Sequence, residues 1–367
     1  MNEKMLHIND VYNGFTVLDI SPILDYKSEG IWLRHNETGL EIFHMYNDDS
    51  ENLFSFAFKT IPSDSTGLAH IMEHSVLCGS KNYPLKDPFI RMANQSVKTF
   101  LNAMTFPDKT VYPASSTVEA DYFNLMAVYA DAVFFPLLKK EIFMQEAHRL
   151  SLGEDGAVSI QGVVFNEMMG NYSSFDSMVQ EKIVQTILPG TTYAFDSGGD
   201  PREIPLLSYE RFLDFHKTFY QPSNCRLFLY GNIPTTKQID FLNEKVLSQF
   251  KTATNPFSQM FLSKQDSDFC AQTQVRAFTA PQNHVCYGPS VKGAGSENGD
   301  SLLLTWLLGF TSDPQSYMES LFLAELLLGH DGAPLAKALI ESGLGEDLEP
   351  ASGIETDLRY ILFTAGM

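Results

Sequence analysis

Two histidines four residues apart, with a glutamate before the second, constrain this chain more than any other feature. They stand in the segment His70-Ile71-Met72-Glu73-His74. Residues four apart on a helix share one face, with Cβ atoms about 6 Å apart, so a helix would let His70 and His74 bind one metal ion. Glu73 would lie near that face without having to be a ligand. Two imidazoles and a nearby carboxylate are the groups that a hydrolytic zinc site needs.

A catalytic zinc site usually has three protein ligands and a water, so a further ligand must come from elsewhere in the chain. The best candidate is Glu167, because this carboxylate follows the apolar run 163–165. Without a third ligand, the pair would be two surface histidines beside a solvated glutamate and would need no function. We therefore expect a distant segment to fold back onto the helix.

Two neighbouring residues could be mistaken for ligands. Cys78 stands four residues after His74, one turn further along the predicted helix, but a free cysteine is more often a small buried core residue. His148 lies in the stretch 141–150, and a lone histidine on an amphipathic helix is usually solvated or hydrogen-bonded locally. We expect neither residue to bind the metal.

Length and charge limit the class of protein. The 367 residues are enough for two domains with separate cores. A hydrophobic content of 44% with 19% charged residues indicates a globular protein. The net charge of −20 argues against a nucleic-acid-binding surface and favours basic partners such as cationic peptides. On charge alone, an acidity that only keeps the protein soluble is an equally good explanation.

The cysteines and the first residues bear on location. The four cysteines contain no C-x-x-C spacing, which favours a reducing compartment. The first six residues lack the basic start and apolar core of a secretory signal, and the scarcity of arginine argues against a transit peptide. The sequence has no run of 18 apolar residues, so we expect no membrane span. The expectation is a cytoplasmic protein with no nucleic-acid or membrane partner.

Hydrophobic periodicity predicts an α+β fold for residues 1–250. Residues 11–60 contain short alternating runs separated by turns, which is typical of antiparallel strands. Residues 63–66 supply capping side chains before the histidine helix, and a second helix, from residue 94, leads into the next strand. Further along, the pattern predicts an edge strand at 100–105, helices at 122–135, 167–187, 209–219 and 237–250, and a strand at 226–230. These elements form an antiparallel sheet with helices packed on one face.

A second unit of the same kind is predicted after a polar linker at 251–273. It begins at residue 274 and continues to residue 367, with strands around 274–280 and 301–309 and a helix at 314–328. Its helix has no histidine pair, so we expect no metal there. The chain stops in a predicted strand, so the predicted fold is a duplicated antiparallel sheet with helices on one face and an incomplete second unit.

Several motifs accompany the histidine pair: GLAHIMEHSVLCGS at 67–80, FLNAMT at 100–105, GVVFNEM at 162–168, SGGDP at 197–201 and YQPSN at 220–224. The first resembles the inverted-zincin peptidases of the pitrilysin and insulinase superfamily, family M16, in which H-x-x-E-H replaces the usual H-E-x-x-H order. The motif at 162–168 narrows the resemblance to the presequence protease branch, which also contains falcilysin. The resemblance runs along nearly the whole chain.

The resemblance implies a zinc metalloendopeptidase that hydrolyses short or unfolded peptides inside an enclosed chamber, and the net charge favours basic peptides among them. Relatives bind substrate by adding it as a strand to a sheet edge beside the zinc. The implied roles are zinc ligands for His70, His74 and Glu167, general base for Glu73, and substrate binding for Asn102 and Ala103.

Full-length relatives continue well beyond the point that corresponds to residue 367. The resemblance implies that this C-terminal half closes the chamber and supplies an Arg and a Tyr that stabilise the tetrahedral intermediate. We therefore expect residues 1–367 alone to bind zinc but to cleave peptides weakly or not at all.

Two other classes of protein stay open. One is a non-catalytic M16-type subunit that binds peptides or assists assembly, although the four intact residues His70, Glu73, His74 and Glu167 count against it. The other is a structural domain stabilised by zinc, which would need a fourth protein ligand and no open coordination position.

Overall fold

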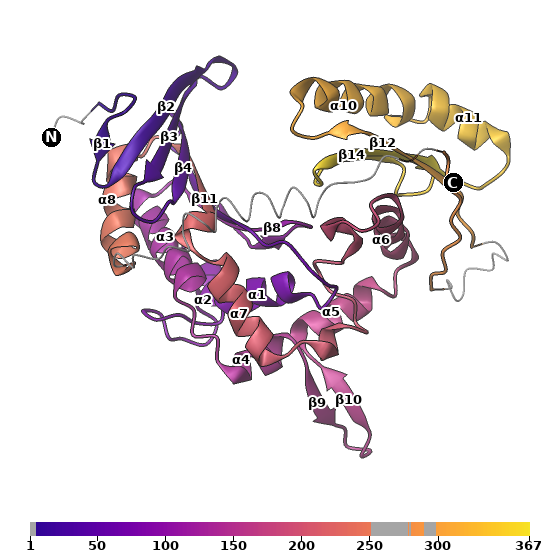
Figure 1. Cartoon of the computed structure of the whole chain (residues 1–367), viewed down its shortest axis with the longest axis horizontal. Helices are drawn as coiled ribbons and strands as arrows, with labels where there is room; N and C mark the ends of the chain where they lie inside the picture. Colours follow the sequence, from indigo (N-terminus) through magenta and orange to yellow (C-terminus); the bar gives the residue numbers. More distant parts are fainter. Residues whose placement is uncertain (1–4, 251–277, 279, 290–298) are drawn as a thin grey trace.

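The computed structural model describes residues 5–250, 278, 280–289 and 299–367. The chain forms a larger unit, drawn from indigo to salmon in Figure 1, and a smaller unit drawn in orange and yellow. The linker predicted at 251–273 lies outside the described residues. The domain boundaries expected from the sequence therefore stay a prediction.

The larger unit is built on a nine-stranded sheet with the order β1-β2-β3-β4-β11-β5-β8-β6, in which β7 also pairs with β8. The strands are β1 (Val11–Tyr12), β2 (Phe15–Ile23), β3 (Ser28–His35), β4 (Glu41–Tyr46), β5 (Asn52–Lys59), β6 (Phe100–Leu101), β7 (Met104–Thr105), β8 (Lys109–Ser116) and β11 (Cys225–Gly231). Neighbouring strands run antiparallel, as predicted, except that β11 runs parallel to β4. A parallel partner requires a long crossover connection, and the helical segments before β11 provide it.

Helices pack against this sheet on the side that carries the aromatic core. They are α1 (Leu68–Val76), α2 (Pro88–Gln95), α3 (Glu119–Phe134), α4 (Lys140–Glu146), α5 (Val163–Asn171), α7 (Tyr209–Phe219) and α8 (Thr235–Lys245). Helix α6 (Phe175–Ile187) lies instead against the smaller unit. Short 3-10 turns lie at 24–26, 192–194, 204–206, 222–224 and 247–249.

Strand β5 shows how the sheet and helices are joined. Its residues Phe54, Phe56 and Phe58 are buried and alternate with partly exposed ones, as a strand with one buried face requires. Their rings meet those of α3: the centroids of Phe54 and Tyr122 are 5.6 Å apart, as are those of Phe58 and Phe134. The central strand and the longest helix of the larger unit thus share one aromatic core.

A hairpin of β9 (Arg149–Leu152) and β10 (Val158–Gln161) projects from the larger unit near α5 (Figure 1). It connects α4 to α5. Because the chain turns back through this hairpin, α4 and α5 lie against each other at its base.

The smaller unit has a three-stranded antiparallel sheet with the order β12-β14-β13, covered by two helices. Its elements are β12 (Leu303–Phe310), α10 (Pro314–Leu328), α11 (Pro334–Ser342), β13 (Gly353–Glu355) and β14 (Tyr360–Gly366). The predicted helix at 314–328 is confirmed, and the strand predicted at 301–309 is β12. Most of the strand predicted around 274–280 lies outside the described residues.

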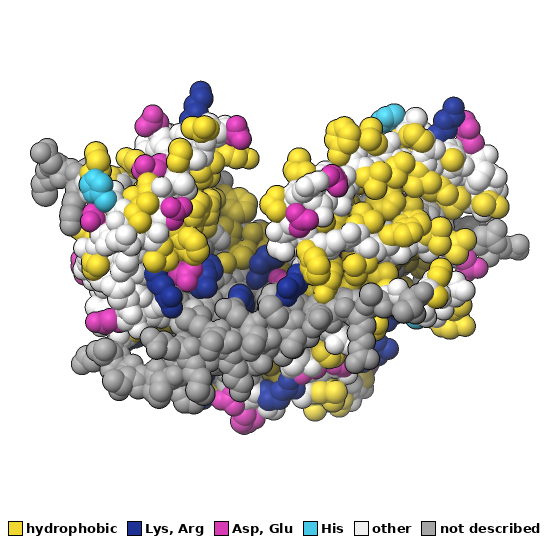
Figure 2. Space-filling view, turned by 45° about the horizontal axis from the view of Figure 1, so that its top comes forward, with side chains coloured by type: hydrophobic (Ala, Val, Ile, Leu, Met, Phe, Trp, Pro, Cys, Tyr) yellow, Lys and Arg dark blue, Asp and Glu magenta, His cyan; other side chains and the backbone are white. Residues whose placement is uncertain are grey.

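The two units meet at α6 and the turn that follows it. Leu188 and Tyr193 of the larger unit pack with Leu358, Tyr360 and Leu362 of the smaller one. Figure 2 shows a hollow between the two units and a concentration of apolar side chains on the smaller one. The exposed apolar residues on β12 and α10 include Leu304, Trp306, Phe310, Met318 and Phe322.

Several predicted boundaries are wrong. Helix α1 starts after Gly67, with no capping side chain, and ends at Val76, so Cys78 lies beyond it. The helix predicted at 167–187 is two helices. Helix α5 starts earlier, at Val163, and ends at Asn171, and α6 starts after Ser174, whose hydroxyl caps it.

The region around the predicted edge strand also differs from expectation. Helix α2 ends at Gln95, before the strand, and the strand itself is split into β6 and β7. Helix α8 ends at Lys245, earlier than predicted. Among the described residues, no helix has the length and apolar character needed to cross a membrane.

Replacing Phe56 with alanine should lower the free energy of unfolding by about 3–5 kcal/mol. The ring is fully buried, with the rings of Phe54 and Phe134 centred 5.6 and 6.0 Å away. Denaturant unfolding followed by circular dichroism measures the loss. Phe43→Ala is the matched control, because its ring is 38% exposed and its loss should be about 1 kcal/mol or less. Equal losses in the two variants would contradict this account of the core.

Candidate metal centre

Helix α1 presents His70 and His74 on one face while its opposite face is anchored. Ile71, Met72 and Val76 are fully buried in the main core, which fixes the rotation of the helix about its axis. The two imidazole rings have centroids 4.9 Å apart and lie nearly perpendicular to each other, at 83°. The spacing of four residues therefore places both rings side by side, as the sequence predicts.

Glu167 reaches this pair from helix α5. Its Oε2 atom lies 3.8 Å from Nε2 of His70 and 3.8 Å from Nε2 of His74. Val164 and Met168 are buried on the same helix and hold it against the core, while the Glu167 side chain stays 55% exposed. The structure thus brings together the three residues proposed from the sequence as ligands. Among the described residues, they are the one group whose potential ligand atoms all lie within 4.8 Å of one another.

The orientation of His70 is set by a loop far away in sequence. Its Nδ1 atom lies 3.1 Å from the carbonyl oxygen of Gly198. A carbonyl can only accept a hydrogen bond, so Nδ1 carries the hydrogen and the neutral ring keeps an unprotonated Nε2. That nitrogen is the one that faces Glu167.

A close approach of two backbones places this carbonyl. Gly67, at the N-terminal end of α1, has φ +67°, and a Cβ there would stand 2.6 Å from the Gly198 oxygen and 2.8 Å from Cα of Gly199. Only glycine fits such a contact without strain. Gly199 of the SGGDP segment at 197–201 is therefore explained by its packing against the start of α1.

His74 is oriented by a buried carboxylate. Its Nδ1 atom donates to Oε2 of Glu146 at 3.2 Å, and Glu146 is only 4% exposed. The other carboxylate oxygen of Glu146 accepts hydrogen bonds from Gln145 at 2.7 Å and from the Cys78 thiol at 3.6 Å. Such a second partner on the far ring nitrogen is typical of histidines that bind metals.

The carboxylates around His74 favour positive charge at this point. Burial alone would lower the pKa of His74, but the hydrogen bond to Glu146 and the surrounding carboxylate charges outweigh burial and raise the pKa. Burial also disfavours the charged form of Glu146, yet hydrogen bonds from His74 and Gln145 outweigh it and lower the pKa of this carboxyl. The same negative surroundings that attract a proton attract a cation.

Glu73, the residue before His74, reaches from α1 toward the sheet edge. It is 8% exposed, and one of its oxygens accepts a hydrogen bond of 2.6 Å from the Thr105 hydroxyl on β7. Thr105 therefore fixes one oxygen of the Glu73 carboxylate, and the other oxygen does not take part in this hydrogen bond. The contact links the predicted general base to the edge strand.

Asn102 and Ala103 lie between β6 and β7 at the edge of the large sheet. The Asn102 N–H donates to the Pro113 carbonyl at 3.1 Å, and its carbonyl accepts from the Tyr129 hydroxyl at 3.0 Å. The Ala103 N–H donates to the Asn102 side chain at 3.0 Å. The structure therefore confirms the edge position of this segment, and its role in substrate binding stays a prediction.

Neither Cys78 nor His148 belongs to the histidine–carboxylate group. Cys78 donates to the carbonyl of His74 and to Glu146, and burial raises the pKa of its thiol above the ordinary range. The Nε2 atom of His148 lies 3.0 Å from the Leu207 carbonyl. Both residues have hydrogen-bond partners outside the group, and Cys78 is partly exposed rather than the buried core residue expected from the sequence.

The donor set fits zinc. Two imidazole nitrogens and one carboxylate oxygen are ligands that zinc accepts, with three protein ligands leaving a position for water. The two separations of 3.8 Å are close to the edge of about 3.4 Å expected for a tetrahedron with bonds of about 2.1 Å. A divalent N/O site is therefore what this arrangement can form.

Sequence reasoning did not assign roles to Glu146, Thr105 or the Gly67–Gly198 contact. Glu146 gives no signal in the sequence, because an acidic residue on an amphipathic helix is usually solvated. The pairing of Thr105 with Glu73 depends on the register of β7 against α1, which one sequence does not supply. The two glycines of SGGDP were the strongest available signal, since paired glycines often mark a close backbone approach.

Two models of known protein families match this chain, and one of them covers the histidine helix. A family model described as "Insulinase (Peptidase family M16)" matches residues 62–156, which include both histidines and Glu73. A second model, described as "Peptidase M16 inactive domain", matches residues 207–367. Glu167 lies between the two matched segments.

Curated relatives match almost the whole chain. Presequence protease 1, chloroplastic/mitochondrial, of Arabidopsis thaliana is 38% identical over 358 residues, which is 96% of this chain and 32% of that protein. Presequence protease, mitochondrial, of Mus musculus is 35% identical over 364 residues, or 98% of this chain and 34% of that protein. This chain thus spans about a third of the length of the curated relatives it matches.

The fold is similar to that of solved structures at lower sequence identity. The crystal structure of pitrilysin matches with a TM-score of 0.60 and 17% identity, covering 96% of this chain and 35% of that one. This likeness supports the predicted fold class, a sheet-and-helix unit of the M16 type.

Replacing Gly67 with alanine should destabilise the protein by more than the roughly 1–3 kcal/mol that positive φ alone costs. The new Cβ would also meet the Gly198 carbonyl, which would displace the hydrogen-bond partner of His70. Thermal unfolding and zinc titration measure the two effects.

Gly156→Ala is the matched control, because Gly156 has φ +79° with open space around its Cβ position. The control should show a smaller loss of stability and unchanged zinc affinity. Equal behaviour of the two variants would show that the Gly67–Gly198 contact does not matter to the metal centre.

Proposed function

The chain belongs to the M16 peptidase family, and from that premise we propose that it is the zinc-binding part of a metalloendopeptidase. The observation that carries the proposal is the convergence of His70, His74 and Glu167 from two helices, with Oε2 of Glu167 3.8 Å from each Nε2. These three residues would hold the zinc, and Glu73 would act as general base.

When bound, zinc would polarise the peptide carbonyl and lower the pKa of a water toward about 7. Glu73 would accept the proton of that water and pass it to the leaving amine. Its hydrogen bond with Thr105 would hold the carboxylate at one position for both transfers. Its burial to 8% exposure would keep bulk water from competing for the proton.

The substrate we propose is a short or unfolded peptide. An extended peptide can add to an exposed sheet edge through main-chain hydrogen bonds, which are indifferent to side-chain identity. The segment Asn102–Ala103 at such an edge, two residues before Thr105, would bind it there. The net charge of −20 would favour basic peptides over acidic ones.

The remainder of the enzyme would come from a longer chain. The relatives are about three times the length of the matched region, and we infer that the remaining two thirds include a further half of the molecule, which closes the chamber and completes the site. The two presequence proteases carry "mitochondrial" or "chloroplastic/mitochondrial" in their names. The cytoplasmic location expected from this sequence stays a prediction.

The two alternatives have less support. A structural zinc domain needs four protein ligands, whereas the group found among the described residues has three members. The M16 model described as an inactive domain covers residues 207–367, and all three proposed ligands lie before that segment. A non-catalytic subunit would not need Glu73 buried and hydrogen-bonded beside the histidines.

Zinc binding and the role of Glu73 can be separated by two variants. His70→Ala should reduce zinc affinity at least about 100-fold, since one of three ligands is lost, as measured by competition with a chromogenic chelator. Glu73→Gln should retain zinc and lose nearly all peptide hydrolysis in the full-length enzyme. Glu119→Gln, a solvent-facing change on α3, should alter neither quantity. Persisting turnover in Glu73→Gln would reject Glu73 as the base.

Residues 1–367 alone should bind one zinc ion and hydrolyse unfolded peptides weakly or not at all. The reason is that zinc would be the one strong partner of the oxyanion without groups from the inferred further half. Cleavage of a fluorogenic peptide by the chain and by the full-length enzyme, each at equal zinc occupancy, measures the difference. Equal rates would contradict the need for a further half.

A further inference from the structure

We propose that Tyr172 and Asp196 are positioning residues of the metal centre, and that their hydrogen bond braces helix α5 against the loop that orients His70. The inference rests on the proposed function, because it concerns the geometry of the zinc ligands. It assigns a role to two residues that touch no ligand atom.

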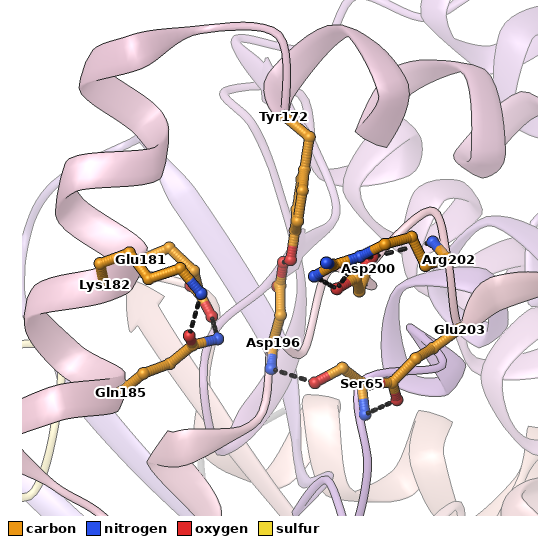
Figure 3. Close-up of polar contacts among 9 residues, drawn as sticks. All are labelled: Ser65, Tyr172, Glu181, Lys182, Gln185, Asp196, Asp200, Arg202 and Glu203. Carbon is orange, nitrogen blue, oxygen red and sulfur yellow. Dashed lines mark hydrogen bonds and ion pairs between the residues drawn. The ribbon is translucent and has the colours of Figure 1, made fainter. Parts of the chain in front are cut away.

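Tyr172 ends the helix that carries Glu167. It is the C-cap residue of α5, and its backbone N–H donates back to the Met168 carbonyl at 2.8 Å. Its hydroxyl donates to Oδ2 of Asp196 at 2.8 Å. Figure 3 shows the Tyr172 ring extending from the end of its helix to meet Asp196. The last turn of α5 is therefore tied to the 196–200 loop.

Asp196 also fixes the part of the loop that reaches His70. Its Oδ1 atom accepts the N–H of Gly198 at 2.8 Å, and the carbonyl of Gly198 accepts the hydrogen bond from Nδ1 of His70 at 3.1 Å. Its own backbone N–H donates to the Ser65 hydroxyl at 3.1 Å (Figure 3). One carboxylate thus joins the helix of Glu167 to the partner of His70.

The loop and α5 are also packed tightly, so that a small displacement of one is transmitted to the other. A Cβ at Gly198 would stand 3.1 Å from Cε and 3.2 Å from Sδ of Met168, the residue that follows Glu167. Packed elements of this kind have little free volume to absorb a shift. Loosening the brace would therefore change the distance between Glu167 and His70.

Asp196 changes the pKa of two neighbouring groups. Burial and the charge of Asp196 raise the pKa of Tyr172, so its phenol stays neutral and can donate. Burial, followed by the charge of Asp196, raises the pKa of Glu181 on α6 to about 7. Each Asp196 oxygen accepts one hydrogen bond from within the loop or from α5, which compensates for the partial burial of its charge.

The first test is Tyr172→Phe, which keeps the ring and removes the hydroxyl. Zinc affinity of the chain, measured by competition with a chromogenic chelator, should fall about 10-fold, as for other groups that orient metal ligands. The visible absorption of the Co²⁺-substituted protein should shift, because it reports the geometry of the ligands. The melting temperature of the metal-free protein should stay near that of the wild type.

The second test separates the two oxygens of Asp196. Asp196→Ala should lower zinc affinity by about 10- to 100-fold, and Asp196→Asn should recover part of the loss because the amide oxygen can still accept the Gly198 N–H. Adding Tyr172→Phe to Asp196→Ala should cause no further loss, since the two residues act through one bond.

Tyr230→Phe is the matched control, because the Tyr230 hydroxyl donates to Asp49 at 2.9 Å away from the ligands and its loss should leave zinc affinity unchanged. Wild-type affinity and an unchanged Co²⁺ spectrum in Tyr172→Phe would overturn the brace while leaving the zinc site intact. If the wild-type chain bound zinc no better than His70→Ala does, the proposed function itself would be overturned.

Discussion

The proposed metal centre depends on the contact between the start of helix α1 and the loop at 196–200. Gly67 and Gly199 pack backbone to backbone, and this contact brings the Gly198 carbonyl to within 3.1 Å of His70. The loop is held in turn by Ser65, whose carbonyl accepts the Asp200 N–H at 2.8 Å. The helix and the loop are therefore placed by the same few atoms, and the imidazole orientation follows from them.

The site also concentrates negative charge in a partly dry setting. Glu73, Glu146 and Glu167 surround two imidazoles, and the first two carboxylates are almost fully buried. Buried carboxylates are costly unless they are paired or hydrogen-bonded. Here Thr105 bonds Glu73, while Gln145 and His74 bond Glu146. Glu167 is half-exposed, and within the described part of the chain no comparable donor bonds its carboxylate, as we expect for the proposed third ligand.

The sequence predicted best those helices whose first residues include a capping side chain or a proline. The predicted bounds of helix 209–219 are the observed ones, and the structure shows the Ser208 hydroxyl capping its first turn. Helix 314–328 likewise begins after a capping Asp313 with a proline in the first turn. Where such signals were missing, boundaries failed: α1 and α5 start after glycines, with no side-chain cap.

Long-range pairings could not be predicted from one sequence. The insertion of β11 between β4 and β5, parallel to one and antiparallel to the other, depends on the whole sheet being assembled. The ligand set was accessible because the His70–His74 spacing and the apolar run before Glu167 are local, and because the surrounding motifs resemble a known family. The residues that orient those ligands, Glu146 and Gly198, lie far away in sequence and carry no spacing signal of their own.

The smaller unit is linked through Tyr193 to the turn that follows the edge strand β7. Tyr193, 2% exposed at the junction of the units, accepts the Arg359 N–H at 3.1 Å and donates to Asp108 at 2.8 Å. Asp108 lies in the turn between β7 and β8, three residues after Thr105. One phenol thus connects the smaller unit to the strand that holds Glu73. The proposed ligands and the proposed base are held within the larger unit, and the junction with the smaller unit reaches the turn that follows the strand of Thr105.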